Sequence, residues 1–172
     1  MHSHKGCSFY PTRSNSCKDS PEWLAQNMRS TRNFIRKWGH MVQHDDMMYP
    51  IIPPKYDVGF VVKNCDTNLL KELEPWCSTI YVDCDYTDYV KDEQKNTAFN
   101  LSDRIKPYYN EKNNNIIVEF DAKQLNSNNF QIIVNMSDIL KDSGDIGDME
   151  YDIFKFNINS LKTYEKDLIN VV

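Results

Sequence analysis

Apolar residues recur at helical spacing in one early stretch of the chain, residues 20–38. Four of them fall on one stripe of a helix, namely Leu24, Met28, Ile35 and Trp38. Ser20 is suited to cap the first turn, Pro21 to occupy the first helical position, and Gly39 to end the helix. The pattern therefore predicts one amphipathic helix, whose apolar stripe packs against the rest of the chain or stays partly exposed as a docking surface.

The following segment, residues 41–55, has no sustained hydrophobic period. It contains Pro50, Pro53 and Pro54, and a proline restricts the residue before it to extended backbone. We therefore predict a proline-rich linker between the first helix and a second unit.

Short apolar runs dominate the second unit. Residues 57–64 and 78–83 are rich in β-branched and aromatic side chains, which predicts two strands. A short helix, capped by Asp66 or Thr67 and stopped by Pro75, is expected between them. Strand, helix and strand in such close succession predict a parallel pair joined by a right-handed crossover.

The rest of the second unit mixes both kinds of pattern. Residues 116–120 predict a third strand, and the alternation of apolar and polar side chains over 154–158 predicts a half-buried strand. The spacing over 128–140 favours a helix, although 132–134 alone also fits a strand. Three further segments complete the prediction: mixed loop and helix over 86–115, a glycine-broken loop at 145–148, and a final helix capped by Ser160.

Together these patterns predict an α/β fold. An N-terminal arm and helix, residues 1–40, and the linker precede a small, mostly parallel α/β sandwich-type domain, residues 56–172. Hydrophobic residues make up 40% of the 172, which is enough to bury a core and argues against general disorder. The net charge of -5 disfavours non-specific nucleic-acid binding, because no excess of cations can displace counterions. We also expect no membrane-spanning segment.

Five cysteines, at positions 7, 17, 65, 77 and 84, form an odd set without a C-x-x-C pair. This arrangement is typical neither of a disulfide framework nor of a structural zinc site. Reduced thiols in a reducing compartment explain it most simply, so we expect a cytoplasmic protein.

Two motifs give the chain a resemblance to a known family. The first is the run His4-Lys5-Gly6-Cys7-Ser8-Phe9, and the second, Asn33-Phe34-Ile35-Arg36-Lys37-Trp38-Gly39, ends the predicted helix. Such a turn, followed by a helix with a Lys-Trp-Gly end, resembles the C-terminal edge of the catalytic domain in family-2, A-type-fold nucleotide-sugar glycosyltransferases. The resemblance covers residues 2–39. The family's donor-binding strands, first Asp-x-Asp motif and acidic base have no counterpart upstream of these motifs.

Three residues are candidate metal ligands. The resemblance implies that His4 helps to hold a divalent cation, Mn or Mg, on the donor diphosphate. Asp83 and Asp85 follow a predicted strand, where open α/β sheets bind ligands, and two carboxylates at this spacing can share a hard cation. A purely polar exit from the strand is the alternative for this pair. His40 and His44, followed by two aspartates, form a further possible metal pair.

These observations lead to two alternative hypotheses about function. In the first, the chain is the C-terminal or accessory part of a glycosyltransferase, inactive alone and completed by a separately encoded catalytic half. In the second, it is a non-catalytic interaction or structural module, for instance a viral assembly component, whose first helix and proline-rich segment dock on a protein partner.

Overall fold

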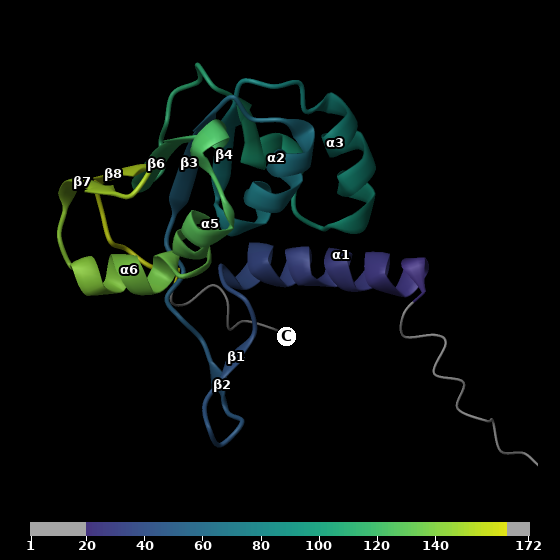
Figure 1. Cartoon of the computed structure of the whole chain (residues 1–172), viewed down its shortest axis with the longest axis horizontal. Helices are drawn as coiled ribbons and strands as arrows, with labels where there is room; N and C mark the ends of the chain where they lie inside the picture. Colours follow the sequence, from purple (N-terminus) through teal and green to yellow (C-terminus); the bar gives the residue numbers. More distant parts are fainter. Residues whose placement is uncertain (1–19, 165–172) are drawn as a thin grey trace, which may run out of the picture.

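Six strands form one mixed sheet in the computed structural model, which describes residues 20–164 (Figure 1). They are β3 (Val58–Lys63), β4 (Thr79–Val82), β5 (Ile105–Pro107), β6 (Ile116–Asp121), β7 (Gly147–Tyr151) and β8 (Phe154–Ile158). Their order is β5-β4-β3-β6-β8-β7. The first four strands in this order are parallel, whereas β8 and β7 are antiparallel to their neighbours. The predicted α/β fold class, with a mostly parallel sheet, is confirmed.

Six α-helices accompany the sheet in the described part of the chain (Figure 1). They are α1 (Pro21–Trp38), α2 (Thr67–Leu73), α3 (Thr87–Glu93), α4 (Leu101–Arg104), α5 (Ser127–Val134) and α6 (Met136–Ser143). Short 3₁₀ turns are η2 (Glu74–Trp76), η3 (Gln94–Asn96) and η4 (Ala122–Gln124). A separate two-stranded hairpin consists of β1 (Gln43–His44) and β2 (Pro50–Ile51).

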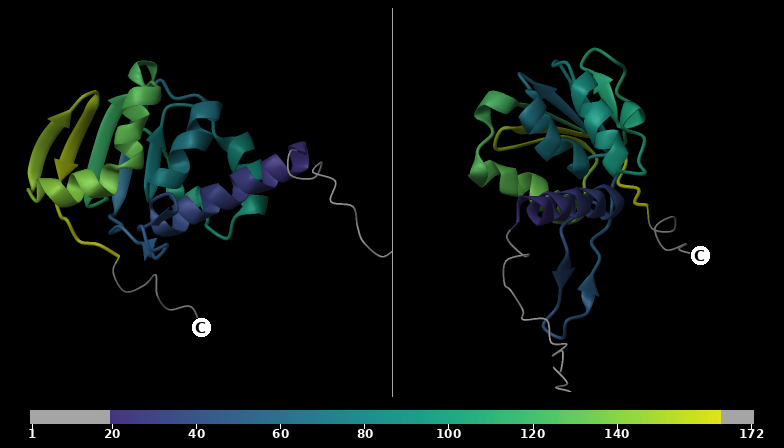
Figure 2. Two further views of the ribbon diagram at one scale, coloured as in Figure 1. Left: turned by 60° about the horizontal axis from the view of Figure 1, so that its bottom comes forward. Right: turned by 90° about the vertical axis from the view of Figure 1, so that its right-hand side faces the viewer.

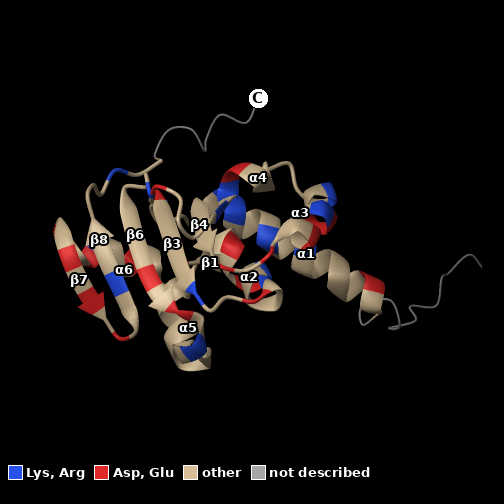
Figure 3. Ribbon diagram, turned by 90° about the horizontal axis from the view of Figure 1, so that it is seen from above, with Lys and Arg blue, Asp and Glu red and all other residues tan. Residues whose placement is uncertain are grey.

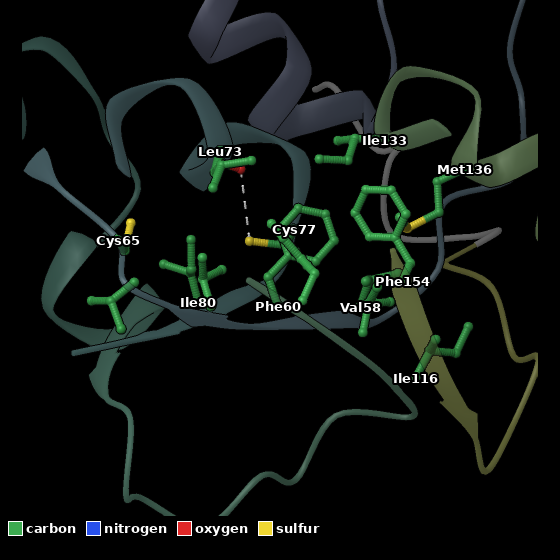
Figure 4. Close-up of a cluster of buried hydrophobic side chains, with 14 of the residues drawn as sticks. Val58, Phe60, Cys65, Leu73, Cys77, Ile80, Ile116, Ile133, Met136 and Phe154 are labelled. Atoms are coloured by element: carbon green, nitrogen blue, oxygen red, sulfur yellow. Dashed lines mark hydrogen bonds between the residues drawn. The ribbon is translucent and has the colours of Figure 1, made fainter. Parts of the chain in front are cut away.

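One face of the sheet carries the hydrophobic core. Phe60 of β3 lies in register with Ile80 on one side and Val118 on the other, so these side chains point to the same face. Leu73 of α2 and Leu140 of α6 join them in one buried cluster (Figure 4). The helices therefore form a second layer on this face, and burial of the apolar side chains between the layers stabilises the fold.

The opposite face is covered only over the central strands. Tyr81 of β4 donates a hydrogen bond from its hydroxyl to the Asn114 Oδ1 atom, and the Asn114 amide donates to Asp57. A Cβ atom at position 59 would lie 2.4 Å from Asn114 Oδ1, so the close approach of this segment requires Gly59. The burial of β3 on both faces follows from this cover.

The local signals at the ends of α1 act as predicted. Ser20 Oγ accepts a hydrogen bond from the backbone N–H of Trp23, and Pro21 occupies the first turn. Gly39 takes the left-handed conformation, with φ of 80°, and its N–H donates to the Ile35 carbonyl. The predicted strands β3, β4, β6 and β8 are also confirmed, as are the capped helix α2 and the parallel pairing of β3 with β4.

The C-terminal part differs from the prediction in three places. β7 begins within the segment predicted as a loop at 145–148, and β5 adds a strand within 86–115. The helix predicted over 128–140 is present as two helices, α5 and α6, which meet at Asn135. The helix predicted from Ser160 is wrong for the described residues, because Thr163 instead forms an isolated antiparallel bridge with Tyr56.

Candidate functional site

The predicted metal ligands lie apart or outside the described residues. His4 falls outside residues 20–164, so its predicted role is not addressed. Asp83 accepts hydrogen bonds from the backbone N–H groups of Asn64 and Cys65, at 2.8 and 3.0 Å, and thereby fixes the turn after β3. Asp85 accepts one from the Thr87 N–H at the start of α3. Hydrogen bonds from Thr87 lower the pKa of Asp85.

The two aspartates therefore hold different turns. This arrangement fits the alternative for this pair, a purely polar exit from the strand. Within residues 20–164 no group of three or more His, Cys, Asp and Glu side chains is arranged to hold a metal ion. The imidazoles of His40 and His44 each contact a different backbone carbonyl, those of Met41 and Asp45. Metal binding by His4, Asp83 and Asp85 stays a prediction.

A buried charged cluster instead connects α1 to the rest of the fold. Arg36 is 1% exposed, although most of α1 before it lies at the surface. Its guanidinium donates to Glu74 at 2.7 Å and to Glu93 at 2.9 Å, and it also contacts Tyr89 and Asn33. Burial alone would lower the pKa of Arg36, but hydrogen bonds and charge from Glu74, followed by Glu93, raise it. Arg36 is therefore charged inside the protein.

Two further arginines complete this cluster. Arg32 donates two hydrogen bonds to the carboxylate of Glu93, both at 2.8 Å. Arg104 bonds the other oxygen of Glu74, and Lys55 donates to the Arg36 carbonyl near the end of α1. We call Arg32, Arg36, Arg104, Glu74 and Glu93 the Arg36 cluster. It attaches α1 to η2, α3 and α4, and truncation of Arg36 would remove one partner from each of two buried carboxylates.

The segment after α1 is a projecting apolar hairpin, where a linker was predicted. Gln43 pairs with Ile51 and His44 with Pro50, in antiparallel fashion. The hairpin extends away from both α1 and the sheet (Figures 1 and 2). Seven large apolar residues of segment 41–52 are exposed: Met41, Val42, Met47, Met48, Tyr49, Ile51 and Ile52. Such an accumulation is unusual for a surface without a partner.

The tip of the hairpin is an ordered turn. One carboxylate oxygen of Asp45 accepts hydrogen bonds from the backbone N–H groups of Met47 and Tyr49, both at 2.9 Å. Met48 takes a left-handed conformation, with φ of 65°, which non-glycine residues rarely adopt. Met47 and Met48 are 74% and 71% exposed. The turn thus presents two flexible apolar side chains to solvent in a defined backbone geometry.

An apolar groove runs beside α1, at the base of the hairpin. We call it the α1 groove; its volume is about 310 Å³. Its apolar lining comprises Leu24, Met28, Ile35, Met41, Pro75, Trp76 and Phe130. Trp76 and Phe130 meet edge to face with ring centroids 6.3 Å apart. A second depression of about 390 Å³, between α2 and α5, shares Glu72 and Phe130 with it.

The outer face of β6, β7 and β8 has a different character. Cations and anions are interspersed over these strands (Figure 3). Lys63 pairs with Glu119 and Lys155 with Glu150, and all four side chains are well exposed. This face is therefore an ordinary solvated surface, on which such pairs contribute little energy. The hairpin and the α1 groove differ from it by their large exposed apolar side chains.

Comparison with known proteins yields no relative. No family model matches the chain, and neither the curated proteins nor the solved structures contain a significant match. The glycosyltransferase resemblance thus stays a prediction. In residues 20–164, no helix is both long and apolar enough to cross a membrane.

Sequence reasoning predicted the amphipathic helix α1 but missed the hairpin and the Arg36 cluster. A signal for the exposed apolar surface was present, because segment 41–52 carries Met, Val, Tyr and Ile residues without a period that would bury them. No local sequence pattern predicts the Arg36 cluster. Its partners lie 38 and 57 residues away from Arg36 in the sequence.

Proposed function

We propose that this chain is a protein-interaction module that docks through its hairpin, residues 41–52, and the α1 groove. The observation that carries this proposal is the exposure of seven large apolar side chains within one hairpin. Contiguous apolar patches beyond a few hundred Å² mark interaction sites on soluble proteins. Methionines are over-represented at adaptable binding surfaces because their side chains are unbranched and polarisable.

The attachment of the hairpin also supports a docking role. The hairpin follows directly after α1, which the Arg36 cluster fixes to the fold. Lys55, just beyond the hairpin, donates to the Arg36 and Lys37 carbonyls at the end of the same helix. Both ends of the hairpin are therefore held, and a pre-positioned arm loses less entropy on binding than a disordered one.

A protein partner fits the tip better than a lipid surface. Asp45 and Asp46 lie at the tip beside Met47 and Met48. Anionic headgroups would repel two carboxylates that must enter the interface with the apolar side chains. The net charge of -5 would likewise oppose binding to an anionic lipid surface. In a protein groove, by contrast, each carboxylate can find a cationic or N–H partner at the rim.

The sugar-transfer hypothesis gains no support from the described residues, since Asp83 and Asp85 hold separate turns. We therefore propose a role as a protein-interaction module. It is consistent with a non-catalytic part of a larger assembly.

Site-specific photo-crosslinking tests the proposal. A benzoylphenylalanine at position 47 is expected to give one discrete protein adduct, either in the purified protein or in cells that produce it. The same group at position 109, which is exposed but lies after β5, is the matched control and should give none. Equal, diffuse labelling from both positions would show that the hairpin is not a docking surface.

A further inference from the structure

We infer that the partner of the hairpin is a second copy of this chain. The tip, with Met47 and Met48, enters the α1 groove of the other copy, and a two-fold axis repeats the contact. This inference rests on the proposed docking function and names its partner.

One chain presents both halves of the proposed contact. The tip carries two unbranched apolar side chains on an ordered turn, and the groove offers an apolar wall with Trp76 and Phe130 as aromatic anchors. The hairpin points away from α1 and thus from its own groove (Figures 1 and 2). In a two-fold dimer each subunit supplies the same tip and the same groove, so both contacts form at once.

One lining cation of the groove can meet the acidic tip. Asp45 and Asp46 flank the methionines at the tip. Arg32 and Lys71 line the groove, together with one acid, Glu72. Arg32 is already paired with Glu93, so Lys71 is the cation that faces the carboxylates of the tip in the proposed contact. Such a charge pair favours the correct orientation of the two copies more than it adds affinity.

The exposed apolar area is of the size that each partner buries in a standard interface. Segment 41–52 contributes seven large apolar residues, and α1 adds Trp23, Leu24 and Met28. At exposures between 41% and 74% these residues offer on the order of 1,000 Å² per chain, compared with ~800 Å² per partner in a standard interface. A hairpin with only two paired positions per strand is also marginal alone, so packing against the partner would stabilise it.

The test compares molar masses of the full chain by light scattering after size exclusion. The unaltered chain is expected at twice its mass of 20.3 kDa. A tip variant, Met47→Asp with Met48→Asp, and a groove variant, Met28→Asp, should each bind roughly 30-fold more weakly and elute at the single-chain mass. Tyr109→Asp, at an exposed position after β5, is the matched control and should remain dimeric.

Mixing the two variants tests reciprocity. The groove variant retains an intact tip and the tip variant an intact groove, so an equimolar mixture regains one of the two contacts and should be partly dimeric. Circular dichroism melting confirms that each variant is folded. A dimer that survives Met28→Asp, or variants that fail to complement, would overturn the inference.

The same data separate this inference from the docking proposal. A single-chain mass for the unaltered protein, combined with an adduct from position 47 to a different protein, rejects the dimer and retains the docking function. A single-chain mass without any adduct rejects both.

Discussion

The Arg36 Nη2 atom lies 2.7 Å from the Glu74 Oε2 atom, and both side chains are fully buried. This pair connects α1 to the turn that follows α2, across 38 residues of sequence. It also explains why a helix with a partly exposed apolar stripe has a fixed position. The polar side of α1, rather than its complete apolar stripe, provides the specific attachment, while Leu24 and Met28 remain available at the groove.

Replacement of Arg36 should therefore be strongly destabilising. Arg36→Ala leaves the carboxylates of Glu74 and Glu93 with fewer partners inside the protein. We expect the free energy of unfolding, measured by urea denaturation, to fall by about 3–5 kcal/mol. Arg29→Ala is the control, because Arg29 is only half-buried and its hydrogen bond stays within α1, to Gln26; this substitution should change the free energy of unfolding by less than about 0.5 kcal/mol. Similar effects of both substitutions would contradict the anchoring role of the Arg36 cluster.

The Arg36 cluster should also make stability depend on acid pH. Burial opposes ionisation of Glu93, but hydrogen bonds from Arg32 and Arg36 hold its pKa below the ordinary value of 4.5. The stabilisation is therefore fully present above pH ~4.5 and is lost as pH falls through the lowered pKa. Thermal melts should show this loss in the unaltered protein. Glu93→Gln should melt at a lower temperature near neutral pH and lose less on acidification; an unchanged acid slope would exclude Glu93 as its source.

Gly59 should not tolerate a side chain. Its added Cβ would lie 2.4 Å from Asn114 Oδ1 and push away the segment that covers β3 and β4. We expect Gly59→Ala to cost about 1–3 kcal/mol in chemical denaturation. In an Asn114→Ala background the cost should be much smaller, because the obstructing atom is removed. Additive effects of the two substitutions would show that the close approach is not the reason for the glycine.

The described cysteines should differ in reactivity. Burial raises the pKa of the Cys77 thiol to about 12, whereas Cys84 is only half-buried. In a variant with Cys7 and Cys17 replaced by serine, a thiol reagent at pH 8 should label Cys84 first and Cys77 only on unfolding. Mass spectrometry of the labelled peptides measures this order. Fast labelling of Cys77 in the folded protein would contradict its buried position.

Elements whose sequence signals are local were predicted, and elements that depend on residues far away in the sequence were not. α1 and β8 were predictable because capping residues and the alternation of side chains are local properties. β5 and β7 were missed because they are short or polar edge strands, whose formation depends on pairing with neighbours. The burial of Arg36 was likewise unpredictable, since it requires Glu74 and Glu93 from distant segments.

In the candidate site too, the features with a local sequence signal were predictable and the others were not. The apolar stripe of α1 was predictable from the sequence, and its partial exposure was one of the two expected outcomes. The proline-rich segment lacked any period, so it was assigned as a linker. Its hairpin depends on two strand pairs and on hydrogen bonds to the Asp45 carboxylate, which composition does not reveal.

Methionine oxidation footprinting tests the central claim, that the hairpin tip docks into a protein surface, most directly. Met47 and Met48 are largely exposed in the free chain, whereas Met136 is buried and serves as the internal reference. We predict that peroxide oxidises Met47 and Met48 rapidly in purified protein diluted to the single-chain state and much more slowly in cells that produce the chain, with Met136 slow in both. Equally rapid oxidation of Met47 and Met48 in both settings would contradict docking through the hairpin.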